Sequence, residues 1–179
     1  MKIVFMGTPD FAATILKDIH DAGHEIAAVY TQPDRPKGRS GKPVASPVKE
    51  YALAHNMPVY QPERIKRPEE VSLLKTFDAD VFVVAAYGQI ISQEILDIPK
   101  YCCVNTHGSL LPKLRGASPI QRAIASGEKE TGVTCMRMDA GVDTGDIISV
   151  VTVPIEDDDD ESSMYEKLAI AGGKLLVET

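Results

Sequence analysis

The chain has 179 residues, of which 44% are hydrophobic and 25% charged, as expected for one globular domain. This composition excludes intrinsic disorder and collagen-like repeats, and no apolar run reaches the ~18 residues that would span a bilayer. The net charge of −7 argues against non-specific binding of nucleic acid by the whole surface. The three cysteines show neither a C-x-x-C pair nor zinc-ligand spacing with histidine, so we expect free thiols in a reducing cytoplasm and no metal.

The first sixty residues alternate between strand and helix patterns. The apolar run 2–6 predicts a buried strand, Asp10 is the expected N-cap of a helix reaching about Ala22, and 25–31 predicts a second strand. This order predicts parallel strands joined by a right-handed crossover. The following stretch, 32–47, contains four prolines and is too long for an ordinary connection in a compact domain.

Strand and helix patterns continue to alternate through the rest of the chain. We expect helices at 48–55, 68–77, 118–126 and 162–177, and strands at 57–60, 79–87, 102–106, 131–138 and 146–153. The pattern predicts one α/β domain over 1–179, with a doubly wound, mostly parallel, Rossmann-like sheet and helices on both faces. Ligands of such sheets bind beyond the carboxyl ends of the strands, so the residues after each strand are the candidates for function.

The turn after the first strand, 7–11, does not support dinucleotide binding. Only Gly7 of the G-x-G-x-x-G fingerprint is present, and Pro9 removes a backbone N–H donor. Gly7 is more simply explained by the turn itself.

The segment 104–112 is the densest candidate site. Asn105 and His107 stand two residues apart at a predicted strand end, so an extended backbone directs both side chains to one side. An amide donor beside a histidine suits a reaction in which a carbonyl oxygen gains negative charge while a proton moves. A structural role for His107 in the core is about equally consistent with its position.

Two further segments have a functional and an ordinary interpretation. The loop 139–146 carries Asp139, Asp143 and Asp146; it does not fit a calcium loop, and it is either a surface turn or the source of a carboxylate that orients His107. Spacing alone does not choose among the three. The stretch 35–49 holds five cations and no acid, and is either a solvated loop or an arm that contacts phosphates. Six consecutive acids, 156–161, would lie away from such a partner.

Four segments together resemble the N-terminal catalytic domain of the methionyl-tRNA formyltransferase family. They are V-F-M-G-T-P-D-F at 4–11, T-Q-P-D-R-P-K-G-R at 31–39, N-T-H-G-S-L-L-P-K-L-R-G-A-S-P-I-Q at 105–121 and M-D-A-G-V-D-T-G-D-I at 138–147. The third and fourth are shared by formyltransferases that use 10-formyltetrahydrofolate. The first two point to the member that acts on tRNA.

The resemblance implies a set of site residues and substrates. It implies that Asn105, His107 and Asp143 form the catalytic trio and that the donor is contacted by Ser109, Leu110, Leu111 and Pro112, with 82–89 (including Tyr87, Gly88 and Gln89) and 139–143 (including Asp139) lining the pterin pocket. It further implies that Arg35, Lys37, Arg39 and Lys42 contact the acceptor arm of methionyl-initiator tRNA. The expected protein is a cytoplasmic monomer that needs no metal.

Two departures and one alternative accompany the resemblance. The family's C-terminal β-barrel, which helps to hold the tRNA, has no counterpart in this sequence, and the acid run 156–161 is denser than expected. The alternative is a 10-formyltetrahydrofolate-dependent enzyme that acts on glycinamide ribonucleotide, on an amino sugar, or on water as a hydrolase. The first of these would need a glycine-rich phosphate loop at 7–11, and the others have no use for the basic stretch.

Overall fold

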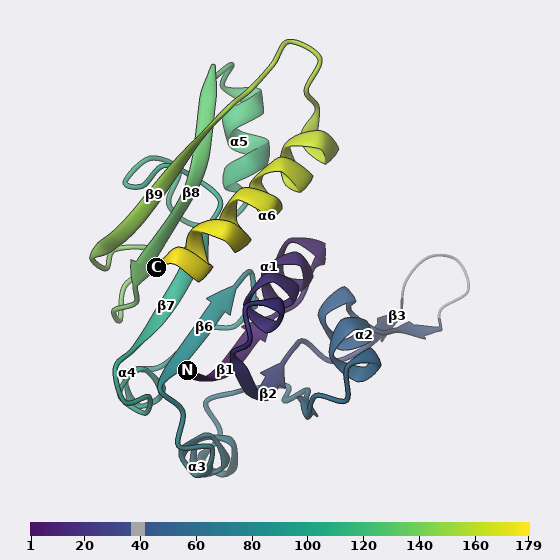
Figure 1. Cartoon of the computed structure of the whole chain (residues 1–179), viewed down its shortest axis with the longest axis vertical. Helices are drawn as coiled ribbons and strands as arrows, with labels where there is room; N and C mark the ends of the chain where they lie inside the picture. Colours follow the sequence, from purple (N-terminus) through teal and green to yellow (C-terminus); the bar gives the residue numbers. More distant parts are fainter. Residues whose placement is uncertain (37–41) are drawn as a thin grey trace.

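The computed structural model describes residues 1–36 and 42–179 and has a seven-stranded sheet at its centre (Figure 1). The strand order is β5-β2-β1-β6-β7-β8-β9, and a two-stranded pair, β3-β4, lies outside the sheet. The strands are β1 (Lys2–Gly7), β2 (Glu25–Tyr30), β3 (Arg35–Pro36), β4 (Pro43–Val44), β5 (Val59–Tyr60), β6 (Val81–Ala85), β7 (Cys102–His107), β8 (Glu130–Arg137) and β9 (Ile147–Pro154). The helices are α1 (Asp10–Asp21), α2 (Pro47–Ala54), α3 (Pro68–Thr76), α4 (Gln93–Leu96), α5 (Pro119–Ala125) and α6 (Glu161–Glu178).

The sheet is mostly parallel, which confirms the predicted fold class. The pairs from β5 to β7 are parallel, whereas β8 pairs antiparallel with both β7 and β9. Only a loop separates β8 from β9, and two strands joined without a crossover helix form an antiparallel pair.

Helices cover both faces of the sheet because the inner strands bury both of theirs. Every residue of β6 is buried, and its alternate side chains belong to two separate cores. One core holds Phe5, Ile15 and Leu168 and lies under α1, α2, α5 and α6. The other holds Phe82 and Leu74 and lies under α3 and α4. Strand β9 closes the sheet, and its exposed and half-buried residues alternate as expected for an edge strand.

Three local expectations need correction. Asp10 is the first residue of α1, and the N-cap is Pro9, whose extended backbone precedes the helix. Helix α4 was missed because its single turn, Gln93–Leu96, is too short to show a periodic pattern. The stretch 32–47 is not wholly irregular, because Arg35 pairs with Val44 and Pro36 with Pro43 in a short antiparallel ladder.

Gly7 allows the first strand and helix to pack closely. A Cβ atom at this position would lie 2.6 Å from Cβ of Ala12 in α1 and 2.8 Å from the carbonyl oxygen of Ala85 in β6. Both distances are shorter than any ordinary van der Waals contact. Packing between β1, α1 and β6 therefore explains the glycine without a ligand-binding turn.

Candidate active site

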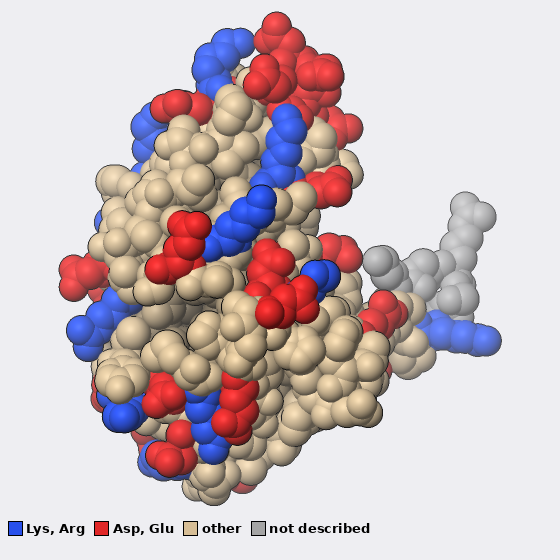
Figure 2. All heavy atoms as spheres, viewed as in Figure 1, with Lys and Arg blue, Asp and Glu red and all other residues tan. Residues whose placement is uncertain are grey.

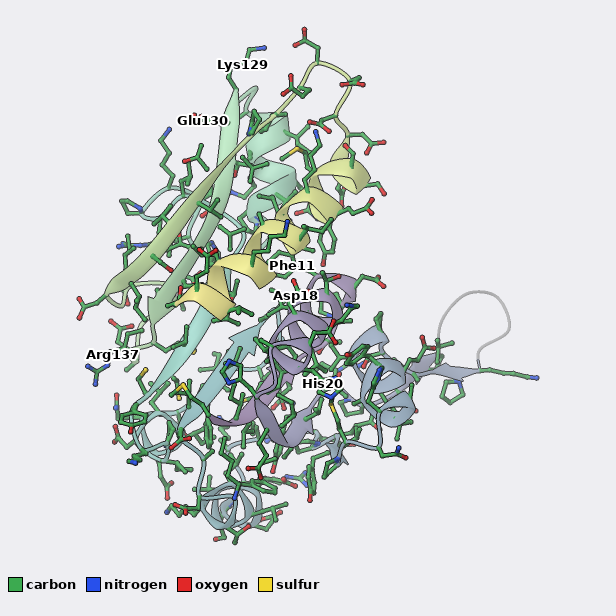
Figure 3. All side chains as sticks on the ribbon, in the orientation of Figure 1. Phe11, Asp18, His20, Lys129, Glu130 and Arg137 are labelled. Carbon is green, nitrogen blue, oxygen red and sulfur yellow. The ribbon has the colours of Figure 1, made fainter. Side chains whose placement is uncertain are left out.

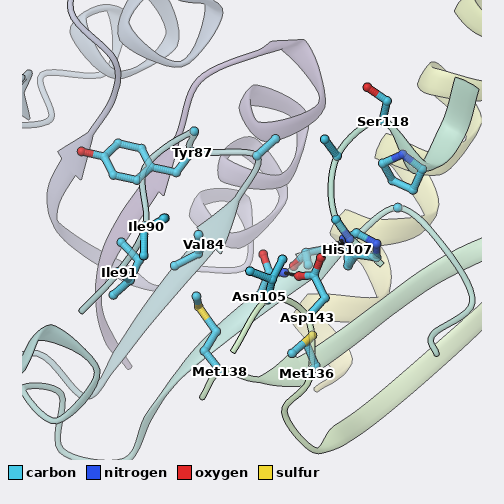
Figure 4. Close-up of a pocket in the computed structure, with 18 of the residues that line it drawn as sticks. Val84, Tyr87, Ile90, Ile91, Asn105, His107, Ser118, Met136, Met138 and Asp143 are labelled. Atoms are coloured by element: carbon cyan, nitrogen blue, oxygen red, sulfur yellow. Dashed lines mark hydrogen bonds and ion pairs between the residues drawn. The ribbon is translucent and has the colours of Figure 1, made fainter. Parts of the chain in front are cut away.

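Asn105 and His107 project from the carboxyl end of β7 into a shared cavity (Figure 4). They occupy alternate positions of the strand, so both side chains lie on one side of the sheet. The His107 side chain is only 8% exposed, whereas Asn105 is half-buried. The His107 side chain is therefore shielded from bulk solvent, and hydrogen bonds in such surroundings act more strongly than in water.

Asp143 joins them although it stands 38 positions after Asn105 in the chain. The Asn105 amide donates to Oδ1 of Asp143 at 3.2 Å, and the backbone N–H of Gly116 donates to Oδ2 at 2.8 Å. Nδ1 of His107 lies 3.5 Å from the same Oδ2. Three donors from two segments thus converge on one carboxylate that is 14% exposed, and the structure brings together the three residues that the resemblance named.

The other nitrogen of the His107 ring determines where its protons lie. Nε2 is 3.1 Å from the carbonyl oxygen of Leu114. A carbonyl can only accept, so Nε2 carries a hydrogen. Nδ1 of the same ring faces the Asp143 carboxylate.

Unusual backbone conformations gather around this site. Within the described residues six non-glycine residues have a positive φ, and four of them lie here: Ala86 (45°), Leu114 (56°), Ser118 (55°) and Asp143 (51°). Each such conformation costs about 1–3 kcal/mol, and strain of this kind is typical of sites where the backbone must aim a group. At Leu114 it accompanies the carbonyl that holds His107, and at Asp143 the carboxylate itself.

The cavity has a volume of about 450 Å³ and extends to both sides of the trio. One wall is mainly apolar and includes Val84, Ile91 and Met138; the loop 139–142 completes it. A second group of lining residues, from α1, α5 and α6, comprises Phe11, Ile120 and Tyr165. Apolar walls with a few convergent polar groups are typical of small-molecule sites, and the volume is in their usual range of about 300–1,000 Å³.

The predicted donor-binding residues fall into two groups. Tyr87, Gly88, Gln89 and Asp139 line the cavity. Ser109, Leu110, Leu111 and Pro112 are not among its lining residues, and their contact with a donor stays a prediction. Phe82, which the range 82–89 placed with the lining of the pterin pocket, lies instead in the core beneath α3 and α4. Val84 is on the same face of β6 but two residues nearer its carboxyl end, and it lines the cavity.

The turn 109–112 is tied to the neighbouring strand. Oγ1 of Thr134 donates to the Ser109 carbonyl at 2.7 Å and accepts from the Leu111 N–H at 3.1 Å. The Ser109 hydroxyl donates to the Lys113 carbonyl at 2.7 Å. These bonds fix the segment that leads from His107 to Leu114.

The three aspartates of the loop 139–146 have different roles. Asp139 Oδ1 accepts from the Gly141 N–H at 3.0 Å and from the Thr144 hydroxyl at 2.7 Å, so it shapes the turn. The Asp146 side chain is exposed, and its backbone carbonyl accepts from the Arg137 N–H. Asp143 alone of the three has its carboxylate at His107.

Several lining residues were not anticipated from sequence. Met136 and Met138 flank the trio, and Phe11 contacts Tyr165 edge to face at 5.9 Å between ring centroids. Figure 3 shows Phe11 on α1 beside α6. The alternation along 134–138 could have indicated Met136, whereas a contact between α1 and α6 depends on tertiary packing.

A second cavity, of about 820 Å³, adjoins the first. The two share Phe11, Gln121 and Tyr165, and four carboxylates line the second: Asp10, Asp160, Glu161 and Glu166. The first turn of α1 therefore carries an acid where a phosphate-binding helix would offer free N–H groups.

The basic stretch lies well apart from the acid run. In Figure 2 basic atoms mark β3 at one side of the molecule, and acidic atoms gather over the turn between β9 and α6. Arg35 and Lys42 are exposed, as a phosphate-contacting role requires, whereas Lys49 is paired with Asp34. Lys37 and Arg39 lie outside the described residues. Part of the acid run is structural, because Asp160 caps α6 and Asp159 binds Lys167.

Metal sites and membrane spans were also sought. Across 1–36 and 42–179, no three histidine, cysteine or acidic side chains are grouped in a way that could hold a metal ion. No helix in the same residues is long and apolar enough to cross a membrane.

Comparison with known proteins places the chain in a family. The sequence model of the formyl transferase family matches residues 1–179. A methionyl-tRNA formyltransferase of Agathobacter rectalis is 52% identical over all of this chain, which spans 58% of that relative's length. A phosphoribosylglycinamide formyltransferase structure from Bacillus halodurans aligns with a TM-score of 0.81 and 28% identity, over 99% of this chain and 92% of that one.

A more distant structure shares the fold alone. A formyltetrahydrofolate deformylase from Pseudomonas syringae aligns with a TM-score of 0.78 at 22% identity, over 99% of this chain and 59% of that one. The full-length match to the family sequence, together with the convergence of Asn105, His107 and Asp143 in one cavity, shows that this chain belongs to the formyl transferase family.

Proposed function

We propose that this protein transfers a formyl group from 10-formyltetrahydrofolate to the free amino group of methionyl-initiator tRNA. The observation that carries the proposal is the trio itself, in which an amide donor and a histidine share one carboxylate in the wall of a cavity. The 52% identity to a methionyl-tRNA formyltransferase supports this choice of acceptor.

In the proposed reaction, the amine nitrogen attacks the formyl carbon and forms the new C–N bond. The carbonyl oxygen becomes an oxyanion, which accepts from the second amide hydrogen of Asn105 and from His107. Donors of this kind are worth ~3–4 kcal/mol each. The C–N bond to the folate then breaks as His107 gives its proton to the departing nitrogen. The neutral ring next takes the proton that the amine loses, with Asp143 helping the relay, so His107 ends the reaction charged as it began.

Both ring nitrogens of His107 have partners, at 3.1 Å for Leu114 and 3.5 Å for Asp143. One of these contacts must therefore yield when His107 donates to substrate. The longer contact with Asp143 is the weaker hydrogen bond, so we propose that Nδ1 turns its proton from the carboxylate to the oxyanion.

The two groups of lining residues suggest how the substrates approach. We place the pterin against the apolar wall of Val84, Ile91 and Met138, and the methionyl side chain against Phe11 and Tyr165. The two substrates then meet at the trio from opposite sides, which satisfies the need for close approach and orientation.

Glycinamide ribonucleotide is the second candidate acceptor, because a phosphoribosylglycinamide formyltransferase is 28% identical over 99% of the chain. That acceptor carries a phosphate. The adjoining cavity has four carboxylates, and the first turn of α1 carries Asp10, so this surface repels a phosphate. The methionyl group of the tRNA carries no phosphate and meets no such repulsion.

The test is to supply the full-length protein with 10-formyltetrahydrofolate and, in parallel, with charged initiator tRNA, glycinamide ribonucleotide or water alone. We expect tetrahydrofolate to be released with the tRNA only. His107→Ala should lower that rate by at least ~10²-fold with the fold intact. Preferential use of glycinamide ribonucleotide, or release at the same rate in water, would refute the proposed acceptor.

The basic stretch supplies a second test of the same proposal. Arg39→Ala should raise the KM for tRNA and make it less sensitive to salt, because the variant neutralises one phosphate fewer. Donor binding, followed by calorimetry, should not change. An equal weakening of donor binding would assign the stretch another role.

A further inference from the structure

The basic stretch is anchored where it leaves and rejoins the domain. The Asp34 carboxylate accepts two hydrogen bonds. Nζ of Lys49 donates to one oxygen at 2.5 Å, and Nε2 of Gln61 donates to the other at 2.7 Å. Asp34 stands just before β3, and Lys49 lies in the first turn of α2, after β4. The Asp34 and Lys49 side chains are 29% and 20% exposed, so solvent screens this ion pair less than it screens Lys17–Asp21 or Lys75–Glu94.

Other contacts reinforce the same base. The hydroxyls of Thr31 and Ser46 lie 2.7 Å apart, and Ser46 caps α2 by accepting from the Lys49 N–H at 3.1 Å. The ladder of Arg35 with Val44 then holds the two sides of the stretch together. β3 and β4 are therefore held together at the side of the domain, where Figure 1 labels β3.

A chain of hydrogen bonds connects this base to the reaction cavity. Nε2 of Gln61 also donates to the Gln32 carbonyl at 2.9 Å, and Nε2 of Gln32 donates to the Tyr87 carbonyl at 3.1 Å. Tyr87 lines the cavity and directly precedes Gly88 and Gln89, which do so as well. The bonds thus run from Lys49 through Asp34, Gln61 and Gln32 to the cavity wall.

We propose that Asp34, Lys49, Gln61 and Gln32 are positioning residues that fix Arg35 and Lys42 relative to the reaction cavity, so that these two cations meet the phosphates of the acceptor while the amine reaches His107. This inference rests on the proposed use of tRNA. A tethered cation that already points to its phosphate loses less entropy on binding than a free one. Lys49 then acts within the protein, and the exposed Arg35 and Lys42 remain for the acceptor.

The test uses the full-length protein with Asp34→Asn, Lys49→Gln and the conservative Lys49→Arg. Lys75→Gln is the matched control, since it removes the ion pair with Glu94 at 3.1 Å outside this network. Steady-state formylation is measured against tRNA and against 10-formyltetrahydrofolate over a series of salt concentrations, together with thermal unfolding. The assay of each variant uses identical tRNA preparations.

We expect Asp34→Asn and Lys49→Gln to raise the KM for tRNA about tenfold, with kcat and the KM for the donor within about twofold of the parent. The slope of log KM against log salt should fall by about one for each phosphate that the variant no longer neutralises. Lys49→Arg should restore most of both quantities. Lys75→Gln should change neither the KM for tRNA nor the salt slope, and it should lower thermal stability less, because its ion pair is more exposed.

The salt slope separates positioning from a purely structural role, because a smaller folded fraction lowers the apparent kcat without changing the slope. An unchanged KM for tRNA in Asp34→Asn, or equal effects on tRNA and donor, would overturn the inference and leave the proposed function intact. A parent protein that does not formylate methionyl-tRNA would overturn the proposed function, and this inference with it.

Discussion

Replacing Asp143 with asparagine tests the central contact of the site. The carboxylate accepts from Asn105, Gly116 and His107. The single oxygen of an asparagine side chain cannot accept from all three donors. Its NH₂ group would also point at one of them, and two donors cannot hydrogen-bond to each other. The substitution keeps the size of the side chain and removes its charge.

The magnitude follows from the distance between Nδ1 of His107 and Oδ2 of Asp143, which is 3.5 Å. Two unit charges at such a separation attract by about 5 kcal/mol at an effective dielectric constant of about 20. The side chains are 8% and 14% exposed, so solvent screens them little. Asparagine retains part of the interaction as a hydrogen bond, and we expect transition-state stabilisation to fall by about 3–4 kcal/mol, or ~10²–10³-fold in kcat.

The assay is single-turnover formylation with saturating donor and charged initiator tRNA, with circular dichroism as the check on folding. Asp146→Asn is the matched control, because it makes the same chemical change in the same loop at an exposed side chain. A folded Asp143→Asn protein within about threefold of the parent would refute the role given to this carboxylate, as would an equal decrease in Asp146→Asn.

Three further predictions concern packing, pH and thiol chemistry. Gly7→Ala should lower the free energy of unfolding by about 1–3 kcal/mol in urea titrations, because a Cβ would lie 2.6 Å from that of Ala12; no change would mean that β1 and α1 can separate freely. Asp159 has a pKa lowered to about 2, first by its hydrogen bond from Lys167 and then by Ser163. A lowered folded-state pKa contributes stability that is complete above the unfolded value near 3.8 and is lost as the pH falls towards 2, so Asp159→Asn should flatten the melting temperature between pH 5 and 2. Burial raises the pKa of the Cys103 thiol to about 12, so iodoacetamide should label it at pH 8 only when the protein unfolds; rapid labelling of the folded protein would contradict its burial.

Much of the fold was accessible from the sequence because its signals are local. The apolar run 79–87 predicted a strand buried on both faces, and β6 is such a strand, flanked by β1 and β7. Helix α1 followed from the four-residue spacing of Phe11, Ile15 and Ile19, all of which are buried. The one-turn helix α4 was not accessible, since it is too short to leave a periodic pattern. The antiparallel pairing of β8 with β7 was not accessible either, since it depends on which strands the tertiary fold sets side by side.

The candidate site divides in the same way. The period of an extended strand was enough to place Asn105 and His107 side by side at the end of β7. Spacing could not choose among Asp139, Asp143 and Asp146, because the choice depends on how the loop after β8 folds back over β7. In the structure Asp143 adopts a φ of 51° and reaches both partners, whereas Asp139 is held by Gly141 and Thr144.

The amino-acid sequence by itself therefore determined the order of strands and helices. It also determined the apolar runs that bury the inner strands on both faces, and the residue types that could carry an acyl transfer. Residue spacing left open which carboxylate meets His107; the family resemblance named Asp143, and the tertiary structure shows the contact. Only the tertiary structure decided that Phe11 and Tyr165 contact each other and that Lys49 belongs to the base of the basic stretch. The reason is physical: periodicity and turn chemistry act within a few residues, whereas a hydrogen bond between residues 38 positions apart exists only after the sheet has brought their segments together.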